Sequence, residues 1–327
     1  MTIRWGMIGT GSVAEHKSGP AFLRAPGGSL EAVASRRHDS ALDYAARHGV
    51  PHVFASPDDL IASELVDAVY IATPPASHLP LALAVAKAGK PCCVEKPMTV
   101  YLRDAEKLCS AFDEAGVPLF VSYYRRSLPR FAAVAQAIGD GAIGTIRSVT
   151  WTLGRVGATP VAGDNWRIDP SEAPGGLFED LACHGLDLFD SLFGPIIHVD
   201  ASRLRIPADS PVPDRVEARW RHGAAIEGHG IWDFAAQART DVVVITGEQG
   251  TILFAMFDEA SIEVHSHAGV VTHDVPNPKP IQLPHVIALN QALGAGVPHP
   301  STGYSALRTA RVSEAILRGG RARIERG

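Results

Sequence analysis

The sequence predicts an α/β protein in which a doubly wound parallel sheet is followed by an α+β domain with an antiparallel sheet. Short apolar runs alternate with helical segments as far as residue 122, which is the pattern of parallel strands joined by helical crossovers. Beyond a helix expected at Pro129–Ile138, longer β-like runs are joined by glycine or short polar turns, as in antiparallel sheets. We therefore expect one domain over residues 1–122 and a second over residues 123–327.

Apolar runs bounded by turn residues define the individual elements. The strands expected in the first domain are Ile3–Ile8, Leu30–Ser35, Ala68–Ala72, Pro91–Val94 and Leu119–Ser122. Those expected in the second are Ile146–Leu153, His198–Ile206, Arg215–Trp220, Ala224–Trp232, Asp241–Thr246, Thr251–Phe254 and Ala260–His265. Pro276–Pro284 is expected to be a proline-rich loop, and Gly303–Arg318 a final amphipathic helix.

Composition and charge exclude several classes of protein. Of the 327 residues, 46% are hydrophobic and 20% charged, which indicates a globular rather than a disordered chain. The formal net charge of −5 is not that of a nucleic-acid binder. No apolar run approaches the roughly 20 residues that span a bilayer, and a strand from Ile3 leaves no room for a signal peptide. The cysteines, which are typical of reduced, buried thiols in a cytoplasmic protein, are Cys92, Cys93, Cys109 and Cys183.

A glycine-rich turn follows the first strand. Residues 9–14 have the pattern G-x-G-x-x-A and open a helical stretch that we expect to reach Arg24. The first glycine permits a tight turn, the second lets the backbone approach a pyrophosphate, and the alanine keeps the helix close to its strand. The helix N-terminus supplies N–H groups for an anion. The residues expected to bind a dinucleotide here are Gly9, Gly11, Ser12, Val13 and Ala14.

The loop after the second strand bears on which nicotinamide cofactor is used. An NAD site usually places an acidic residue there, which binds the ribose 2′-hydroxyl. This chain instead has Ser35, Arg36 and Arg37, a hydroxyl and two guanidiniums that suit a 2′-phosphate. An ordinary solvated basic loop is the alternative. We favour NADP(H) over NAD(H).

The loop after the third expected strand would wall the cofactor groove. It begins with Thr73 and Pro74, and two consecutive prolines hold its backbone extended. His78 ends this loop at the start of the next helix. We expect it to be either a ligand contact or a helix-capping or solvated residue.

A charged pair ends the Pro91–Val94 run, where Glu95 and Lys96 are followed by Pro97. This order places an ammonium group at the carboxyl end of a parallel sheet, which is where open α/β proteins bind their ligands. We expect all three residues to contact the cofactor, and Lys96 to face the reaction as well.

A polar pair interrupts an apolar helix in the second domain. Asp180 and His184 follow Gly175-Gly176 and are four residues apart, so they share one helix face. A carboxylate beside an imidazole fixes its tautomer and raises its basicity, as general acid–base catalysis requires. The apolar neighbours favour a functional pair over a surface ion pair.

Taken together, these motifs resemble the glucose–fructose oxidoreductase, inositol dehydrogenase and rhizopine-catabolism family, abbreviated Gfo/Idh/MocA. The resemblance spans essentially the whole chain, and its combination of motifs is specific. It implies an N-terminal Rossmann domain and a C-terminal domain with an open, mostly antiparallel sheet. Members commonly use that sheet face to dimerise, so a homo-oligomer, dimer or tetramer, is expected. The resemblance also implies a cis peptide bond between Lys96 and Pro97.

The family resemblance further implies a nicotinamide-dependent dehydrogenase or reductase that acts on a sugar, a polyol or cyclitol, or a related carbonyl compound, usually without a metal. It assigns Lys96, Asp180 and His184 to catalysis. We expect His184, oriented by Asp180, to give or take the proton, and Lys96 to bind and polarise the reacting oxygen. Proton transfer by Lys96 is the alternative, and the sequence does not decide between the two residues. The Ser35-Arg36 pair resembles NADP(H)-dependent branches of the family. The candidate substrate-binding residues are Tyr123, Arg125, Trp166 and Arg167.

Three alternatives are weighed against this interpretation. A related enzyme that hydrolyses glycosides through transient redox would show no net cofactor change. A regulatory protein that senses a dinucleotide would not need Lys96, Asp180 and His184 together. A metal site at His265-x-His267 with His273 lacks a carboxylate or cysteine at a recognisable spacing, so a solvated strand end is the simpler interpretation.

Overall fold

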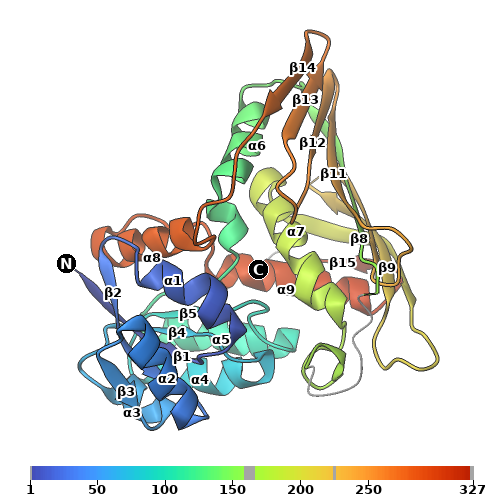
Figure 1. Ribbon diagram of the computed structural model, residues 1–327. Coiled ribbons are helices and arrows are strands. Elements are labelled where there is room, and N and C mark those ends of the chain that lie inside the picture. The colour runs from blue at the N-terminus through green and yellow to red at the C-terminus, as the bar shows by residue number, and fades with distance from the viewer. Residues whose placement is uncertain (1, 158–165, 224–225, 325–327) are drawn as a thin grey trace. The chain divides into compact units, whose positions relative to one another are not determined.

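The computed structural model describes residues 2–157, 166–223 and 226–324 (Figure 1). The chain divides into two compact units: unit 1 comprises Met1–Leu128 with Pro278–Leu307, and unit 2 comprises Pro129–Asn277 with Arg308–Gly327. This division differs from a single boundary between residues 122 and 123, because a late segment of the chain returns to the first unit. Over the described ranges, no helix combines the length and apolar character needed to cross a membrane.

In the described part of the chain, unit 1 is built on a six-stranded parallel sheet with the order β3-β2-β1-β4-β5-β6. This order is that of a doubly wound dinucleotide-binding fold, as predicted. The short strand β3 is missing from the sequence prediction because none of its three residues is fully buried. The strands are β1 (Ile3–Ile8), β2 (Gly28–Ala34), β3 (His52–Phe54), β4 (Ala68–Ile71), β5 (Cys92–Val94) and β6 (Leu119–Val121).

Helices cover both faces of this sheet. On one face the Trp5 ring packs against Phe22 of α1, with ring centroids 5.0 Å apart. On the other, a Cβ added at Gly6 would lie 2.6 Å from Leu60 of α3, so glycine lets that helix come close. The helical segments are η1 (Ala14–Ser18), α1 (Gly19–Phe22), α2 (His38–His48), α3 (Pro57–Ala62), η2 (Pro75–Ser77), α4 (His78–Lys87), α5 (Leu102–Ala115), η3 (Tyr124–Ser127) and α8 (Leu283–Ala295).

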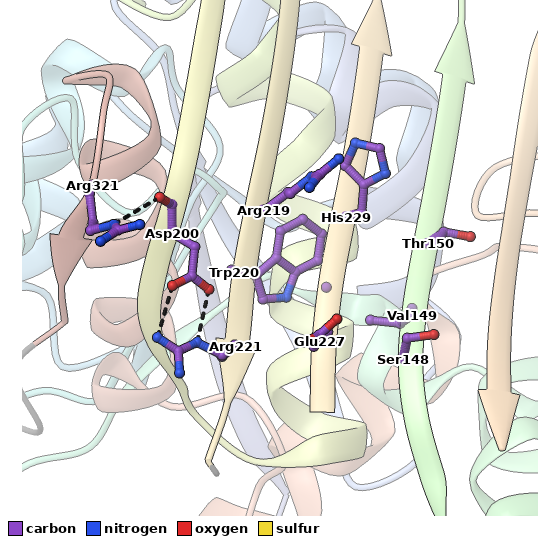
Figure 2. A pocket seen from close by; sticks show the side chains of 11 residues that line it. Ser148, Val149, Thr150, Asp200, Arg219, Trp220, Arg221, Glu227, His229 and Arg321 are labelled. Atoms are coloured by element: carbon purple, nitrogen blue, oxygen red, sulfur yellow. Dashed lines mark hydrogen bonds and ion pairs between the residues drawn. The ribbon is translucent and has the colours of Figure 1, made fainter. Parts of the chain in front are cut away.

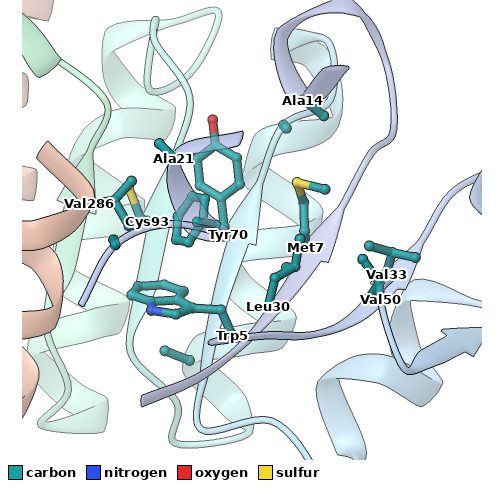
Figure 3. Close-up of a cluster of buried hydrophobic side chains, with 14 of the residues drawn as sticks. Trp5, Met7, Ala14, Ala21, Leu30, Val33, Val50, Tyr70, Cys93 and Val286 are labelled. Carbon is teal, nitrogen blue, oxygen red and sulfur yellow. The ribbon is translucent and has the colours of Figure 1, made fainter. Parts of the chain in front are cut away.

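Helix α8 replaces the end of the expected proline-rich loop. Pro284 occupies its first turn, where a missing N–H costs nothing. Trp5 Nε1–H donates to Asn290 Oδ1 (2.8 Å), and Asn290 Nδ2 donates to the carbonyl oxygen of Pro26 (2.9 Å), so α8 is bonded to the sheet and to the turn before β2. Figure 3 shows Val286 of α8 among the buried side chains around Trp5 and Tyr70.

Unit 2 contains a nine-stranded sheet over its described residues, with the order β14-β13-β12-β11-β7-β10-β9-β8-β15. All its pairings are antiparallel except β7 with β10, which confirms a mostly antiparallel sheet. Strands β14 and β15 are missing from the sequence prediction, because β14 is fully exposed and β15 has two residues. The strands are β7 (Ile146–Gly154), β8 (Ile196–Arg205), β9 (Arg215–His222), β10 (Ile226–Asp233), β11 (Thr240–Gly247), β12 (Gly250–Phe254), β13 (Ile262–Ser266), β14 (Gly269–His273) and β15 (Ala322–Arg323).

Helix α7 (Leu177–Phe193) packs on β9 and β10, and α6 (Pro129–Gly139) on β13. Aromatic rings fill the space beneath α7: Trp151 lies edge-on to Trp232, with ring centroids 5.6 Å apart. A Cβ at Gly185 of α7 would lie 2.3 Å from the Trp151 ring, so the helix can come this close to the sheet only with glycine there.

The division between the units falls within helix α9 (Gly303–Leu317). The part of α9 that belongs to unit 2 makes polar contacts with α7. Arg308 donates two hydrogen bonds to the buried Asp190 carboxylate (2.9 and 2.7 Å). Thr309 Oγ1 donates to Asp187, which is also buried. Both acceptors lie on α7, so packing and polar contacts together determine where this helix lies in unit 2.

Candidate functional site

The loops predicted to bind the cofactor start at the same edge of the sheet in unit 1. Ile8 is in register with Ala34 of β2 and with Ile71 of β4, and Ile71 is in register with Val94 of β5. The carboxyl ends of these strands are therefore level, and the four loops begin side by side at Gly9, Ser35, Ala72 and Glu95.

The glycine turn has the backbone geometry that its motif requires. Gly9 has a φ of +103°, and a Cβ there would lie 2.7 Å from the Ala72 carbonyl oxygen. A Cβ at Gly11 would meet nothing within 4 Å, so the backbone at Gly11 faces open space. The helical run extends from Ser12 to Phe22, slightly short of the expected Arg24, and its middle five residues form the π-helical turn η1. These residues fit a bound pyrophosphate.

The basic loop leads directly into α2. Arg36 and Arg37 are exposed, with Arg37 at the N-cap position of α2, and Ser35 is half-buried. Neither guanidinium bonds to another residue in the described ranges. Thr10 Oγ1 lies 2.9 Å from Ser40 Oγ, which links the glycine turn to the first turn of α2. Two unengaged cations thus stand beside a helix N-terminus, an arrangement that attracts a phosphate.

His78 is fully buried at the start of α4. Its Nε2 lies 2.8 Å from the carbonyl oxygen of Thr73, and its Nδ1 lies 3.0 Å from that of Pro97. The imidazole therefore joins two of the four loops. Because of its burial, His78 is not the solvated residue that was one alternative from the sequence, whereas a ligand contact and a helix-capping role stay predictions.

Glu95 stabilises the turn that carries Lys96. The Lys96–Pro97 peptide bond is cis, as predicted. The buried Glu95 carboxylate accepts hydrogen bonds from the Tyr70 hydroxyl (2.7 Å) and Gln282 Nε2 (3.1 Å) on Oε1, and from the Lys96 N–H (3.1 Å) on Oε2. Glu95 thus points into the protein. Gln282 lies 187 residues further along the chain, and no local signal marks it in the sequence.

The second group of predicted catalytic residues lies on α7 in unit 2. Asp180 and His184 are both buried, with 8% and 5% of their surface exposed. Arg167 Nε lies 2.7 Å from Asp180 Oδ2, so a residue predicted to bind substrate forms an ion pair with a predicted catalytic one. Trp166 is the first residue of the short 3₁₀ turn η4 (Trp166–Ile168), which also contains Arg167. The His184 ring lies edge-on to Phe257, with centroids 5.9 Å apart.

The Phe257 ring is fixed by a carboxylate that the sequence analysis misses. Asp241 Oδ2 accepts hydrogen bonds from the backbone N–H groups of Phe257 (2.6 Å) and Asp258 (3.1 Å). Its Oδ1 accepts a bond from Trp151 Nε1 (3.2 Å). Asp241 thus connects Trp151, which packs against α7, with Phe257, whose ring lies edge-on to His184. Because it begins an apolar strand, its pattern predicts only a strand end.

The glycine pair before α7 is also bonded to that helix. Gly176 has a φ of +58° and forms the N-cap, and the Gly175 N–H donates to Glu179 Oε2 (2.8 Å). Burial raises the pKa of Glu179 to about 7. The helix that carries Asp180 therefore begins with a carboxyl group that titrates near neutral pH.

The remaining candidates for substrate binding, Tyr123 and Arg125, lie in unit 1 and are buried. The Arg125 guanidinium lies over the Tyr124 ring, 4.9 Å from its centroid. The cofactor loops and Lys96 thus belong to unit 1, and the Asp180–His184 pair belongs to unit 2.

A polar hollow of about 560 Å³ lies on the face of unit 2's sheet that carries Arg219, Arg221 and His229. Arg221 donates two hydrogen bonds to Asp200 (2.9 and 2.8 Å), and Arg321 Nε donates to the Asp200 carbonyl oxygen. Figure 2 shows Arg219 and His229 adjacent to each other on neighbouring strands. None of the predicted catalytic or cofactor-binding residues lines this hollow.

The cysteines and histidines have ordinary structural environments. The four cysteines are buried and form no disulfide in the described part of the chain, as predicted. His265, one of the residues considered for a metal, lies 2.8 Å from Glu263. In the described ranges, no three His, Cys, Asp or Glu side chains are grouped as metal ligands.

Sequence comparison supplies the decisive observation. A family model described as "oxidoreductase family, NAD-binding Rossmann fold" matches residues 3–123, and the Gfo/Idh/MocA C-terminal domain model matches residues 131–253. The chain belongs to the Gfo/Idh/MocA oxidoreductase family. The predicted family, fold class and enzyme class are thereby confirmed, and the dinucleotide predicted from the glycine turn agrees with the NAD-binding fold of the family.

Known family members resemble this one along most of their length. Oxidoreductase P35 of Formosa agariphila is 32% identical over 314 residues, which cover 95% of this chain and 96% of that protein. The 1,5-anhydro-D-fructose reductase of Ensifer adhaerens is 28% identical over 282 residues, 85% of this chain and 78% of that protein. A levoglucosan dehydrogenase solved with NADH and levoglucosan has the same fold, with a TM-score of 0.88, 22% identity and full coverage of both chains.

Proposed function

We propose that this family member transfers a hydride between NADP(H) and a sugar, a polyol or cyclitol, or a related carbonyl compound. The observation that carries the proposal is the buried Asp180–His184 pair in a chain whose other unit is an NAD-binding Rossmann fold. A buried acid–imidazole pair suits proton transfer, which must accompany hydride transfer to or from an oxygen-bearing carbon.

His184, Asp180 and Lys96 have separate roles in the proposed reaction. When bound, the nicotinamide supplies or accepts the hydride. In the reducing direction His184 gives a proton to the substrate oxygen, and in the oxidising direction it takes that proton back. Asp180 orients the imidazole and offsets its charge. Lys96 places an ammonium at the same oxygen and stabilises the negative charge that develops there.

The preference for NADP(H) rests on the basic loop. Arg36 and Arg37 are exposed beside the N-terminus of α2, and the loop has no acidic residue to bind a 2′-hydroxyl. The levoglucosan dehydrogenase structure holds NADH, so the fold itself does not decide this preference. The two guanidiniums favour the 2′-phosphate by charge and by their ability to donate paired hydrogen bonds.

The relatives support the proposed substrate class. The named reductase and the named dehydrogenase both act on anhydro sugars, by their names. We therefore place sugars and anhydro sugars first among the compounds to test, followed by polyols and cyclitols. We propose that Trp166 and Arg167 bind the substrate. We propose the same role for Tyr123 and Arg125.

Two substitutions test the catalytic assignment, Lys96→Ala and His184→Ala. Each should lower kcat by at least about a hundredfold, as expected for loss of a general acid–base or charge-stabilising group. The dissociation constant for NADPH should change by less than about threefold, because neither group contributes to phosphate binding. Lys87→Ala and His267→Ala are matched controls at exposed positions and should leave kcat unchanged. Near-normal turnover in either active-site variant would remove that residue from the mechanism.

We also propose that the protein forms a homo-oligomer, a dimer or tetramer, through the sheet face that carries Arg219 and Arg221. That face presents charges of both signs, Arg221 beside Asp200, as a self-complementary contact needs. Light scattering of the wild type and Arg219→Glu tests this: the variant should shift toward the monomer. A monomeric wild type would contradict it. With four buried cysteines and no disulfide among the described residues, the protein suits a reducing compartment, and we propose that it is cytoplasmic.

A further inference from the structure

The His78 imidazole has an unusual pair of partners. Both ring nitrogens lie at hydrogen-bonding distance from backbone carbonyl oxygens, 2.8 Å for Thr73 and 3.0 Å for Pro97. A carbonyl oxygen can only accept. A neutral imidazole has one N–H donor and one nitrogen lone pair, so it can satisfy one of these carbonyls and not both.

His222 shows the contrasting arrangement within the same chain. Trp220 Nε1–H donates to its Nε2 (3.0 Å), and its Nδ1 lies 2.7 Å from the Gly194 carbonyl oxygen. One ring nitrogen therefore accepts and the other donates, which defines a neutral tautomer. Among the described residues, a carbonyl oxygen and not a donor lies opposite each ring nitrogen of His78.

The surroundings of His78 contain one compensating charge. Burial is the largest influence and lowers the pKa of His78, whereas the backbone of Thr73, Pro97 and Met98 and the Glu95 carboxylate act to raise it. The two carbonyl acceptors, which only a charged ring can satisfy together, favour the imidazolium against that shift. If the ring were neutral, a lone pair of the buried imidazole would face one of the two carbonyl oxygens, and neither that nitrogen nor that oxygen would have a donor from the other. A charged ring donates to both oxygens, and charge-assisted hydrogen bonds are the stronger kind.

We infer that His78 is held as an imidazolium and is a positioning residue for Lys96. The ring clamps the Pro97 carbonyl, which directly follows Lys96, to the Thr73 carbonyl at the start of the neighbouring loop. Glu95 holds the same turn from its other side through the Lys96 N–H. Opposite charges thus fix the turn that carries the Lys96 ammonium. The consequence for turnover rests on the proposed role of Lys96, whereas the charge state of His78 does not.

The charge state can be observed directly in the wild-type protein. Long-range proton–nitrogen correlation spectra of protein labelled with ¹⁵N-histidine distinguish protonated from bare ring nitrogens. At pH 8, where an ordinary histidine is neutral, His78 should show two protonated nitrogens, assigned by nuclear Overhauser contacts to Pro97 and by its absence in His78→Gln. His222 supplies an internal reference with a single protonated nitrogen. A His78 ring with one bare nitrogen at pH 8 would overturn the inference.

Two variants test the positioning role. His78→Gln keeps two N–H donors on one amide, and His78→Leu keeps a similar volume with none. At saturating cofactor, His78→Leu should lower kcat on the order of tenfold, the effect of losing a charge-assisted hydrogen bond, and His78→Gln should recover most of that loss. Equal losses in both would show that the ring only fills space. If His78→Leu fails to fold, the wild-type spectrum still decides the charge state.

Different results would contradict the catalytic role of Lys96 and the charged state of His78. Normal turnover in Lys96→Ala would remove Lys96 from the mechanism and leave a doubly protonated His78 as a structural clamp. A neutral His78 would overturn the clamp and leave the effect of Lys96→Ala as it stands.

Discussion

Arg167 Nε lies 2.7 Å from Asp180 Oδ2, so the guanidinium contacts the pair on α7 to which we assign proton transfer. The sequence makes Arg167 a candidate for substrate binding. From the ion pair we infer a second role, which is to orient the Asp180 carboxylate and offset its charge. These two roles predict different kinetics.

Arg167→Met should lower kcat on the order of tenfold, because Asp180 would lose a charge-assisted hydrogen bond that orients it. Arg167→Lys, which keeps the charge but not the planar fork, should fall between Arg167→Met and the wild type. Steady-state kinetics at saturating cofactor provide the measurement. A rise in KM with kcat unchanged would indicate that Arg167 only binds substrate.

Gly185→Ala should destabilise unit 2 by about 1–3 kcal/mol, the usual cost of overpacking a core. The added methyl group would lie 2.3 Å from the Trp151 ring and push α7 off the sheet. Gly139→Ala is a matched control at the end of α6, where a Cβ would meet nothing within 4 Å. Thermal melting of both variants checks the prediction, and equal melting temperatures would contradict it.

The fold class could be predicted because its signals are local. The glycine turn at residues 9–14 and the alternation of strands and helices each need only a short window of sequence. Helix α8 could not be predicted, since its place in unit 1 depends on Asn290 bonding to Trp5, 285 residues away in the sequence. The edge strands β3 and β14 lack a buried face and so leave no apolar pattern.

The candidate site divides in the same way. Lys96, Asp180 and His184 lie in short motifs that predict chemistry by residue type and spacing. Gln282 and Asp241 have no such motif, because their roles arise from contacts with Glu95 and with the Phe257 backbone that form only in the folded chain. His78 could be noticed but not interpreted, since its partners are backbone carbonyl oxygens.

Acid should destabilise the protein through its buried histidines. Burial lowers the pKa of His222 and of His299 to about 4. Below pH 6.5 the unfolded chain takes up protons that the folded one does not, so stability falls from about pH 6.5 to about pH 4. Each residue contributes a slope of about 1.4 kcal/mol per pH unit.

His222→Gln isolates one part of that slope. The amide can still accept from Trp220 Nε1 and donate to the Gly194 carbonyl oxygen, and it does not titrate. Denaturant unfolding at pH 7 and pH 5 should show a smaller loss on acidification for the variant than for the wild type. An identical loss would mean that His222 protonates as readily in the folded as in the unfolded state.

Glu179 should act in the opposite direction. Burial raises its pKa to about 7, so the folded state favours the neutral acid. The protonated Glu179 is favoured by the folded state, so its stabilising contribution is fully present below about pH 4.5. That contribution is lost as the pH rises through 7 and Glu179 ionises. Glu179→Gln keeps an acceptor for the Gly175 N–H and should raise the melting temperature by several degrees at pH 8, with a smaller gain at pH 5.5. A gain independent of pH would contradict this account.

We propose that this family member prefers NADP(H) because of the basic loop that begins at Ser35. The most direct test is to titrate cofactor-stripped protein with NADPH and, separately, with NADH, following energy transfer from its five tryptophans. Arg36→Glu serves as the matched variant. NADPH should bind the wild type at least about tenfold more tightly than NADH, since each paired charge-assisted contact is worth about 1.5 kcal/mol or more, and the variant should lose that preference. Equal or tighter binding of NADH by the wild type would contradict the claim, and binding of neither would contradict the oxidoreductase mechanism itself.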